Sequence, residues 1–282
     1  MPAYIFKLLT IFCCLLQPAF GATVKVKIID GEKEQLVFDI LELALSHSAP
    51  GTTYVFDTTS KNEAQMMADI DSGALDVMWS GAAQEKDDAM MAVRIPVLKG
   101  LLGHRIFIIR DADKQKFASI RTMQDLKQFY AGQGTFWGDS TVLKNADIPL
   151  VTTIKYANLF PMLEGGRFDY FPRAVHEPWV EVESRPELNL AIDSNVMLIY
   201  PYAMYFYVKK DNQALHDLIH RGFDMAIADG SFDKLFFSHP MIQDVMNNAH
   251  LSERTVFRIP NPTMHKDTPL DVQAYWLDVS KH

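Results

Sequence analysis

The chain has 282 residues, 48% of them hydrophobic, and a formal net charge of −8 at pH 7. This length and apolar content suffice for one or two globular domains with a proper core. The acidic balance argues against nucleic acid as a partner, because a nucleic-acid-binding surface is normally basic.

The first 22 residues predict a secretory signal peptide, residues 1–22. Lys7 supplies a positive charge, Leu8–Leu16 an apolar run, and Ala19–Ala22 the small residues of a cleavage region. The apolar run is shorter than the roughly 20 residues that a membrane-spanning helix needs. We therefore expect the segment to be removed and the mature protein to lie in a bacterial periplasm.

Both cysteines, Cys13 and Cys14, fall inside this signal segment. The mature chain then has no disulfide, no thiol nucleophile and no cysteine-based metal site. His216 and His220 have the spacing of a zinc-peptidase helix, but Asp217 stands where those enzymes have glutamate, and no third ligand is visible. We expect an exposed helix face there, and neither a metal nor any other cofactor.

The first part of the mature chain alternates strands and helices. We predict strands at Val24–Ile29, Thr53–Thr58 and Leu75–Trp79, and helices at Gln35–Ser46 and Asn62–Ser72. Such a βαβαβ unit forms a parallel sheet. Its third strand ends in Trp79, Ser80 and Gly81.

The middle of the chain repeats this alternation. Strands are predicted at Gly100–Arg110, Lys127–Ala131, Thr152–Tyr156 and Phe168–Phe171, with helices around Thr122–Gln128 and up to Glu164. A glycine-containing turn, Gly132–Thr135, follows the second of these strands, and Arg173 follows the last. After them we predict strands at Leu188–Ile192 and Tyr200–Val208, helices at Gln213–Ala228 and from Ser231 through Phe237, and a surface loop from Ile259 onward.

A ligand site is expected where these strands end, because ligands of parallel α/β sheets sit beyond the carboxyl ends of the strands. The candidate contacts are Trp79, Ser80, Gly81, Gly134, Thr135, Trp137, Arg173 and His176. Six of these eight residues have a plainer alternative. The two tryptophans can be core packing, Gly134–Thr135 an ordinary turn, Arg173 a solvated rim charge, and His176–Glu177 a helix cap or a support for Arg173.

Two connectors suggest a discontinuous domain wrapped around an inserted one. The charged stretch Arg110–Lys116 and the segment Tyr200–Tyr205 are the expected crossings. Lobe 1 would comprise 23–110 and 204–282, and lobe 2 would comprise 111–203.

In this order, the features resemble the family 3 extracytoplasmic solute-binding proteins of bacterial amino-acid ABC importers. Gly73-Ala74-Leu75-Asp76 and Gly166-Arg167-Phe168-Asp169 resemble that family's repeated G-x-x-D step between a helix and a strand. The family's lobe-crossing segment resembles Asp125-Leu126-Lys127 followed by Gly132–Thr135 in this chain. The start of a late helix in the family resembles Asp229-Gly230-Ser231. The resemblance implies the periplasmic-binding-protein type II fold: two α/β lobes of mostly parallel sheets, flanked by helices, with a ligand cleft between them.

The chain departs from the family pattern at both ligand anchors. No arginine follows Ser80–Gly81 closely, since the first is Arg94, and Pro172-Arg173-Ala174 stands where an aspartate usually holds the ligand ammonium. A guanidinium at that point attracts a carboxylate or phosphate.

The expected function is capture of a small polar or anionic ligand, amino-acid-like or a carboxylate, by hinge closure of a monomer that delivers it to an ABC permease. One alternative is a ligand sensor for a membrane receptor. The other is a periplasmic lyase or dehydratase on the same fold, with His176 or Glu177 as general acid or base. No catalytic residue is assigned, because no hydrolase or phosphate-loop motif is present.

Overall fold

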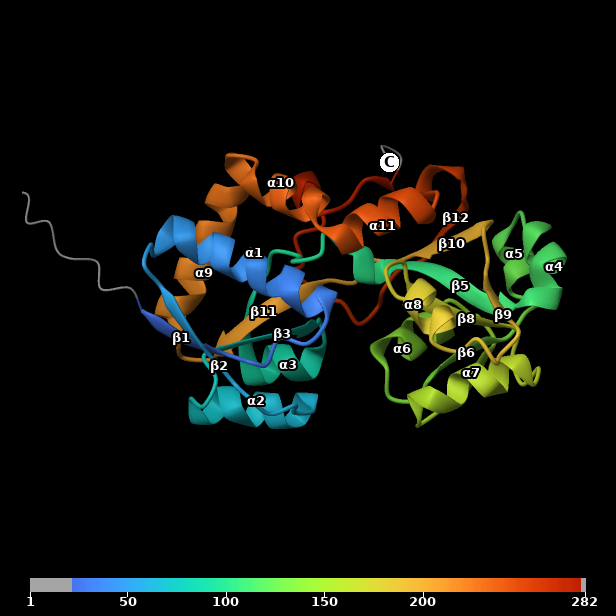
Figure 1. Cartoon of the computed structure of the whole chain (residues 1–282), viewed down its shortest axis with the longest axis horizontal. Helices are drawn as coiled ribbons and strands as arrows, with labels where there is room; N and C mark the ends of the chain where they lie inside the picture. Colours follow the sequence, from blue (N-terminus) through green and yellow to red (C-terminus); the bar gives the residue numbers. More distant parts are fainter. Residues whose placement is uncertain (1–21, 280–282) are drawn as a thin grey trace, which may run out of the picture.

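The computed structural model describes residues 22–279, so the predicted signal peptide, apart from Ala22, lies outside the described residues. Two β-sheets, each flanked by helices, lie side by side along the long axis of the molecule (Figure 1). The predicted two-lobed α/β fold is confirmed. In the part of the chain that the structure describes, no helix combines the length and apolarity that crossing a membrane requires.

Lobe 1 is built on a five-stranded sheet with the order β2-β1-β3-β11-β4. Its strands are β1 (Thr23–Val26), β2 (Thr53–Phe56), β3 (Val77–Gly81), β4 (Met90–Val93) and β11 (Met204–Lys209). Its helices are α1 (Glu32–Ser48), α2 (Glu63–Ser72), α3 (Gln84–Ala89), α9 (Gln213–Ala228), α10 (Ser231–Ser238) and α11 (Pro240–Asn248). The apolar side chains of α1, among them Leu36, Ile40, Leu41 and Leu45, are buried. A capping box between Asn62 and Gln65 starts α2.

Lobe 2 is built on a seven-stranded sheet with the order β12-β10-β5-β8-β6-β7, and β9 also pairs with β5. The strands are β5 (His104–Arg110), β6 (Ala131–Gly134), β7 (Leu150–Thr153), β8 (Tyr170–Ala174), β9 (Leu190–Ile192), β10 (Val196–Ile199) and β12 (Thr255–Arg258). Five helices complete the lobe: α4 (Lys114–Ala118), α5 (Met123–Leu126), α6 (Gly138–Asn145), α7 (Tyr156–Glu164) and α8 (Pro178–Glu183).

The sheets are mixed rather than mostly parallel. β1 runs parallel to β2 and β3, and β6 runs parallel to β7 and β8. Every antiparallel pairing in the described residues involves β5 or β11. β5 and β11 both begin directly after the chain has passed from one sheet to the other, and each runs antiparallel to the strands beside it; β12, which also follows a passage between the sheets, pairs parallel with β10.

The chain passes between the sheets at residues 94–103, at 200–203, and a third time between α11 and β12. The predicted lobe boundaries are wrong for two strands. β5 and β12 belong to the second sheet, although both fall within the residue ranges predicted for lobe 1. The charged stretch Arg110–Lys116 lies at the far end of β5 and is not a crossing. Since β12 lies in lobe 2 while Leu277 and Val279 are buried in the lobe 1 core, the tail crosses back as well.

Two local predictions also fail, for identifiable reasons. Lys127–Ala131 is not a strand, because the Thr122–Asp125 capping box begins a short helix, α5, that ends in tight turns before β6.

Gly132 and Gly134 lie in strand β6 rather than in a turn. A Cβ at Gly132 would lie 2.2 Å from the Phe168 ring, and one at Gly134 would lie 2.5 Å from the Trp137 ring. The glycines are therefore required for close packing.

The long aromatic strand predicted at Tyr200–Val208 begins only at Met204. The four residues before it form the second crossing, where Pro201 has no N–H to donate to a sheet. The helix Gln213–Ala228 is confirmed to its ends.

Candidate functional site

A cleft of about 610 Å³ lies between the two lobes. Lobe 1 contributes the end of β3 and the starts of α1, α2 and α3, and lobe 2 contributes the loop from β6 into α6, the start of α7, and β8. Leu102, Arg105, Tyr202 and Met204 line it from the crossings and the strands that follow them. The cleft thus lies beyond the carboxyl ends of the parallel strands β3 and β6, where α/β sheets bind ligands.

Tyr202 lies at the centre of the second crossing and touches both lobes. A Cβ at Gly81 in lobe 1 would lie 2.7 Å from the Tyr202 hydroxyl, and a Cβ at Gly138 in lobe 2 would lie 3.4 Å from it. Its hydroxyl is therefore wedged between the backbones of the two lobes. Burial raises the pKa of Tyr202, so the phenol stays neutral.

Arg105 fastens the crossing strand β5 to helix α6. Its Nη2 donates to Asp139 Oδ1 at 2.7 Å, and the Tyr200 hydroxyl donates to the same oxygen at 2.5 Å. The guanidinium also lies over the rings of Tyr200 and Tyr202, at 5.6 and 5.9 Å. Burial alone would lower the pKa of Arg105, but Asp139, Tyr200, Glu177 and Tyr202 together outweigh it and raise the pKa. The group therefore stays a cation that is ion-paired through Nη2, while its Nε is buried without a hydrogen-bond partner among the described residues.

Arg173, on β8, is enclosed by two carboxylates of its own lobe. Its Nη2 lies 2.6 Å from Glu181 Oε1 and 3.0 Å from Glu177 Oε1, and its Nε donates to Glu181 Oε2 at 2.8 Å. The guanidinium carbon lies 5.4 Å from the Trp137 ring centre and 5.6 Å from that of Tyr156. Burial would raise the pKa of Glu177, but Arg173, His176 and Arg105 outweigh it and lower the pKa to about 2.

The lobe 1 wall carries its own ion pairs. Lys27 Nζ lies 2.6 Å from Glu34 Oε2, an oxygen that also accepts the indole N–H of Trp79 at 2.7 Å. Lys86 Nζ lies 2.5 Å from Glu63 Oε1 and donates to the Gly81 carbonyl at 2.8 Å. The Ser80 hydroxyl donates to the other Glu63 oxygen.

The structure brings five of the eight predicted residues to the cleft: Trp79, Ser80, Gly81, Trp137 and Arg173. Trp79 is only 2% exposed and packs edge-on against Phe206, so most of its ring is core. Gly134 is buried behind the Trp137 ring, and Thr135 is exposed outside the lining.

His176 is not among the lining residues. Both of its ring nitrogens are buried without a hydrogen-bond partner among the described residues, and burial lowers its pKa to about 4. No group of three or more metal-ligating side chains is found within residues 22–279.

Several lining residues were missed in the sequence, above all Arg105, Asp139 and Tyr156. Their partners are brought together by the fold and leave no local pattern. Glu177 and Glu181 follow Arg173 by four and eight residues, but they reach it because α8 packs beside β8, so their spacing in the sequence does not predict the pairing.

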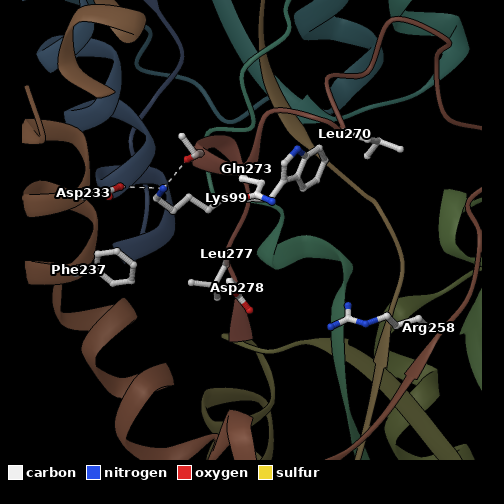
Figure 2. Close-up of a pocket in the computed structure, with 10 residues that line it drawn as sticks. Lys99, Asp233, Phe237, Arg258, Leu270, Gln273, Leu277 and Asp278 are labelled. Atoms are coloured by element: carbon white, nitrogen blue, oxygen red, sulfur yellow. Dashed lines mark hydrogen bonds and ion pairs between the residues drawn. The ribbon is translucent and has the colours of Figure 1, made fainter. Parts of the chain in front are cut away.

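A second cavity, of about 450 Å³, lies under the C-terminal segment (Figure 2). Lys99 Nζ lies 2.8 Å from Asp233 Oδ1, a contact that Figure 2 shows as a dashed line, and it donates to the Ala274 carbonyl at 2.9 Å. A smaller cavity of about 340 Å³ adjoins it and is lined by His104. Since His104 and Arg105 are neighbours on β5, their side chains point to opposite faces of the strand, so these cavities lie behind the crossings, away from the cleft.

The fold has known counterparts among binding proteins. An ancestral arginine-binding protein, solved with arginine bound, superposes with a TM-score of 0.52 at 17% identity, covering 78% of this chain and 99% of that one. The probable amino-acid ABC transporter extracellular-binding protein ytmK of Bacillus subtilis gives a TM-score of 0.56 at 17% identity, covering 79% and 99%.

The chain has the fold of these binding proteins. A histidine kinase sensor domain with similarity to periplasmic binding proteins matches equally well, with a TM-score of 0.51 at 15% identity, covering 78% and 97%. No protein-family model and no curated protein matches the sequence.

Proposed function

We propose that this protein is an exported solute-binding protein that captures a small polar ligand in the cleft between its lobes. The observation that carries the proposal is the cleft itself: its walls come from both sheets, at the strand ends where the sequence predicts ligand contacts. The solved proteins that share the fold include amino-acid ABC transporter binding proteins.

The proposed mechanism is hinge closure about the crossings 94–103 and 200–203. Each lobe supplies part of the cleft wall, so a ligand that touches both walls binds the closed state more tightly than the open one. Closure is the signal that a membrane partner reads. We propose an ABC permease as that partner, with the protein acting as a periplasmic monomer.

A sensor role is the second candidate, because one structural counterpart is a histidine kinase sensor domain. The same cleft and the same closure would then present the liganded form to a receptor.

We propose no catalysis. Glu177 is held as a carboxylate by Arg173, and its pKa of about 2 leaves it no proton to donate near neutral pH. His176 is outside the cleft lining. The paired arrangement suits a binding wall better than an acid–base pair.

The test is direct. Purified mature protein is examined by native mass spectrometry for a carried-over solute, then titrated with a solute library by thermal shift. A ligand at a hundredfold excess over its Kd stabilises by about 2.7 kcal/mol. The variant Ser80→Trp, which fills the cleft, should lose this shift, whereas Ser119→Trp, at an exposed position in lobe 2, should keep it. A ligand that stabilises both variants equally binds elsewhere and contradicts the proposal.

A further inference from the structure

The basic side chains of the cleft are already neutralised by the protein. Of the described residues, five basic ones line the cleft: Lys27, Lys33, Lys86, Arg105 and Arg173. Their carboxylate partners lie 2.5 to 3.3 Å away. A ligand carboxylate would have to compete with these partners for the basic groups, and wherever it displaced a buried partner it would leave that charge unpaired, which offsets what the new ion pair gains. The buried Nε of Arg105 has no partner among the described residues, but a neutral carbonyl oxygen can accept its hydrogen bond too.

Lys33 has the longest ion pair of the five, with 3.3 Å between its Nζ and Glu34 Oε1, and it shares this glutamate with Lys27. Its side chain is 38% exposed, so solvent and salt screen its charge. It is a poor substitute for a buried, unpaired guanidinium as an anchor for a carboxylate.

The lobe 2 wall of the same cleft is aromatic. Phe136, Trp137 and Tyr156 all line it, and the rings of Trp137 and Tyr156 lie 6.1 Å apart between centres. Phe136 is 83% exposed, the most exposed large hydrophobic side chain in the described part of the chain. An exposed ring inside a cleft offers a face on which a planar ligand can stack and lose water.

The opposite side of the cleft supplies polar groups. Ser80 and the backbone of Gly81 lie on lobe 1, and the Tyr202 hydroxyl lies at the crossing. These groups can hydrogen-bond the edge of a ring compound without needing a charge on it. One wall therefore fits the face of a ring, and the other fits its polar edge.

We infer that the ligand of this cleft is an aromatic or heteroaromatic solute whose binding does not depend on a carboxylate. It stacks on Phe136 from lobe 2 and is hydrogen-bonded from lobe 1. This inference rests on the proposed function, because it names the class of solute that the same cleft captures.

The test compares matched amides and acids on the intact mature protein: nicotinamide with nicotinate, benzamide with benzoate, and indole-3-acetamide with indole-3-acetate. Arginine, glutamine and succinate serve as non-aromatic comparators. Calorimetric titration is run at about 0.05 M and about 0.5 M salt, which changes the screening length roughly threefold. At least one amide is expected to bind as tightly as its acid or more tightly, with an affinity that salt leaves unchanged.

Two variants complete the design. Phe136→Ala removes the exposed ring and should weaken the binding of that amide about tenfold, because a stacked aromatic pair contributes about 1.4 kcal/mol. Val180→Ala, at a 71% exposed position outside the cleft lining, is the matched control and should bind as the wild type does.

The outcomes separate the two proposals. If a non-aromatic comparator or an acid binds best, and Phe136→Ala binds it unchanged, the ligand class is overturned while solute capture stands. If the wild-type protein binds none of the compounds, and carries no solute in the native mass spectrum, both fail. Amide binding that Phe136→Ala and Val180→Ala weaken equally also overturns the stacking role.

Discussion

Arg173 and Glu181 are joined by three contacts of 2.6 to 3.0 Å between the guanidinium and the carboxylate. The arginine is on β8 and the glutamate on α8, so the pair ties a strand of the lobe 2 sheet to the helix that follows it. With Glu177 on its other side, the guanidinium presents no unpaired charge to the cleft. The expectation of an anionic ligand depended on such a charge.

We therefore expect the Arg173–Glu181 pair to contribute to the free energy of unfolding. Arg173→Ala leaves two carboxylates facing each other in a buried site, and we expect it to lower the free energy of unfolding by about 3 kcal/mol. The double variant, Arg173→Ala with Glu181→Ala, should lose less unfolding free energy than the two single variants lose together. The difference, which is the coupling energy of the pair, should be at least about 1 kcal/mol. Urea unfolding of the two single variants and the double variant measures this. Additive effects would mean that the pair is not coupled.

Stability should fall as the pH drops below about 6.5. Burial lowers the pKa of both His104 and His176 from 6.5 to about 4, so between these values the unfolded chain binds protons that the folded chain excludes. Each histidine thus destabilises the fold increasingly from pH 6.5 down to about 4. Glu177, with its pKa lowered from 4.5 to about 2, acts in the same direction from about 4.5 to 2, because protonation removes its attraction to Arg173.

Urea unfolding at pH 7 and pH 5 tests the histidine contribution. The groups that act on His176 are Glu177, Lys33, Arg105 and Arg173. His176→Gln removes one titrating ring, so it should lose less stability between the two pH values than the wild type, by an amount on the order of 1 kcal/mol. An identical pH dependence in this variant would show that His176 has the same pKa in the folded and unfolded chains, and a steeper one that folding raises it; either result contradicts the lowered pKa.

Much of the fold was predictable because it follows from local patterns. The apolar periodicity of α1 and α9 and the capping residues Asn62 and Thr122 each act within one or two helical turns. Strand partners are not local. The sequence of β5 carries no mark that it pairs with β8, β9 and β10, and the short β12 reaches β10 across more than fifty residues.

The residues of the candidate site were predictable where they lie at strand ends. They were not predictable where they depend on ion pairs between residues that the fold brings together. Ser80, Gly81 and Trp137 lie at the cleft because the carboxyl ends of strands meet there. The charge of Arg173 is neutralised by carboxylates four and eight residues later, and that of Arg105 by Asp139, which is thirty-four residues away. Only the folded chain shows that both cations are neutralised.

Gly81 is required at the crossing because Tyr202 occupies the space of a side chain there. Gly81→Ala would place a Cβ 2.7 Å from the Tyr202 hydroxyl and 3.1 Å from its ring carbon Cζ. We expect a loss of about 1–3 kcal/mol in unfolding free energy, the usual cost of overpacking. Tyr202→Phe removes the nearest atom and should recover part of this loss. Gly138→Ala is the control, since its Cβ would meet the same hydroxyl at an ordinary 3.4 Å.

The C-terminal segment is expected to be an integral part of lobe 1 rather than a surface loop. Leu277 is 8% exposed within the lobe 1 core, and its N–H donates to the Lys99 carbonyl at 2.8 Å. Leu277→Ala should therefore lower the unfolding free energy by about 2–5 kcal/mol, as for other buried leucines. Leu270→Ala, in the same segment but at 48% exposure, should change it by less than about 0.5 kcal/mol. Urea unfolding of both variants decides the matter, because equal small effects would mean that the segment is not packed against the lobe in solution.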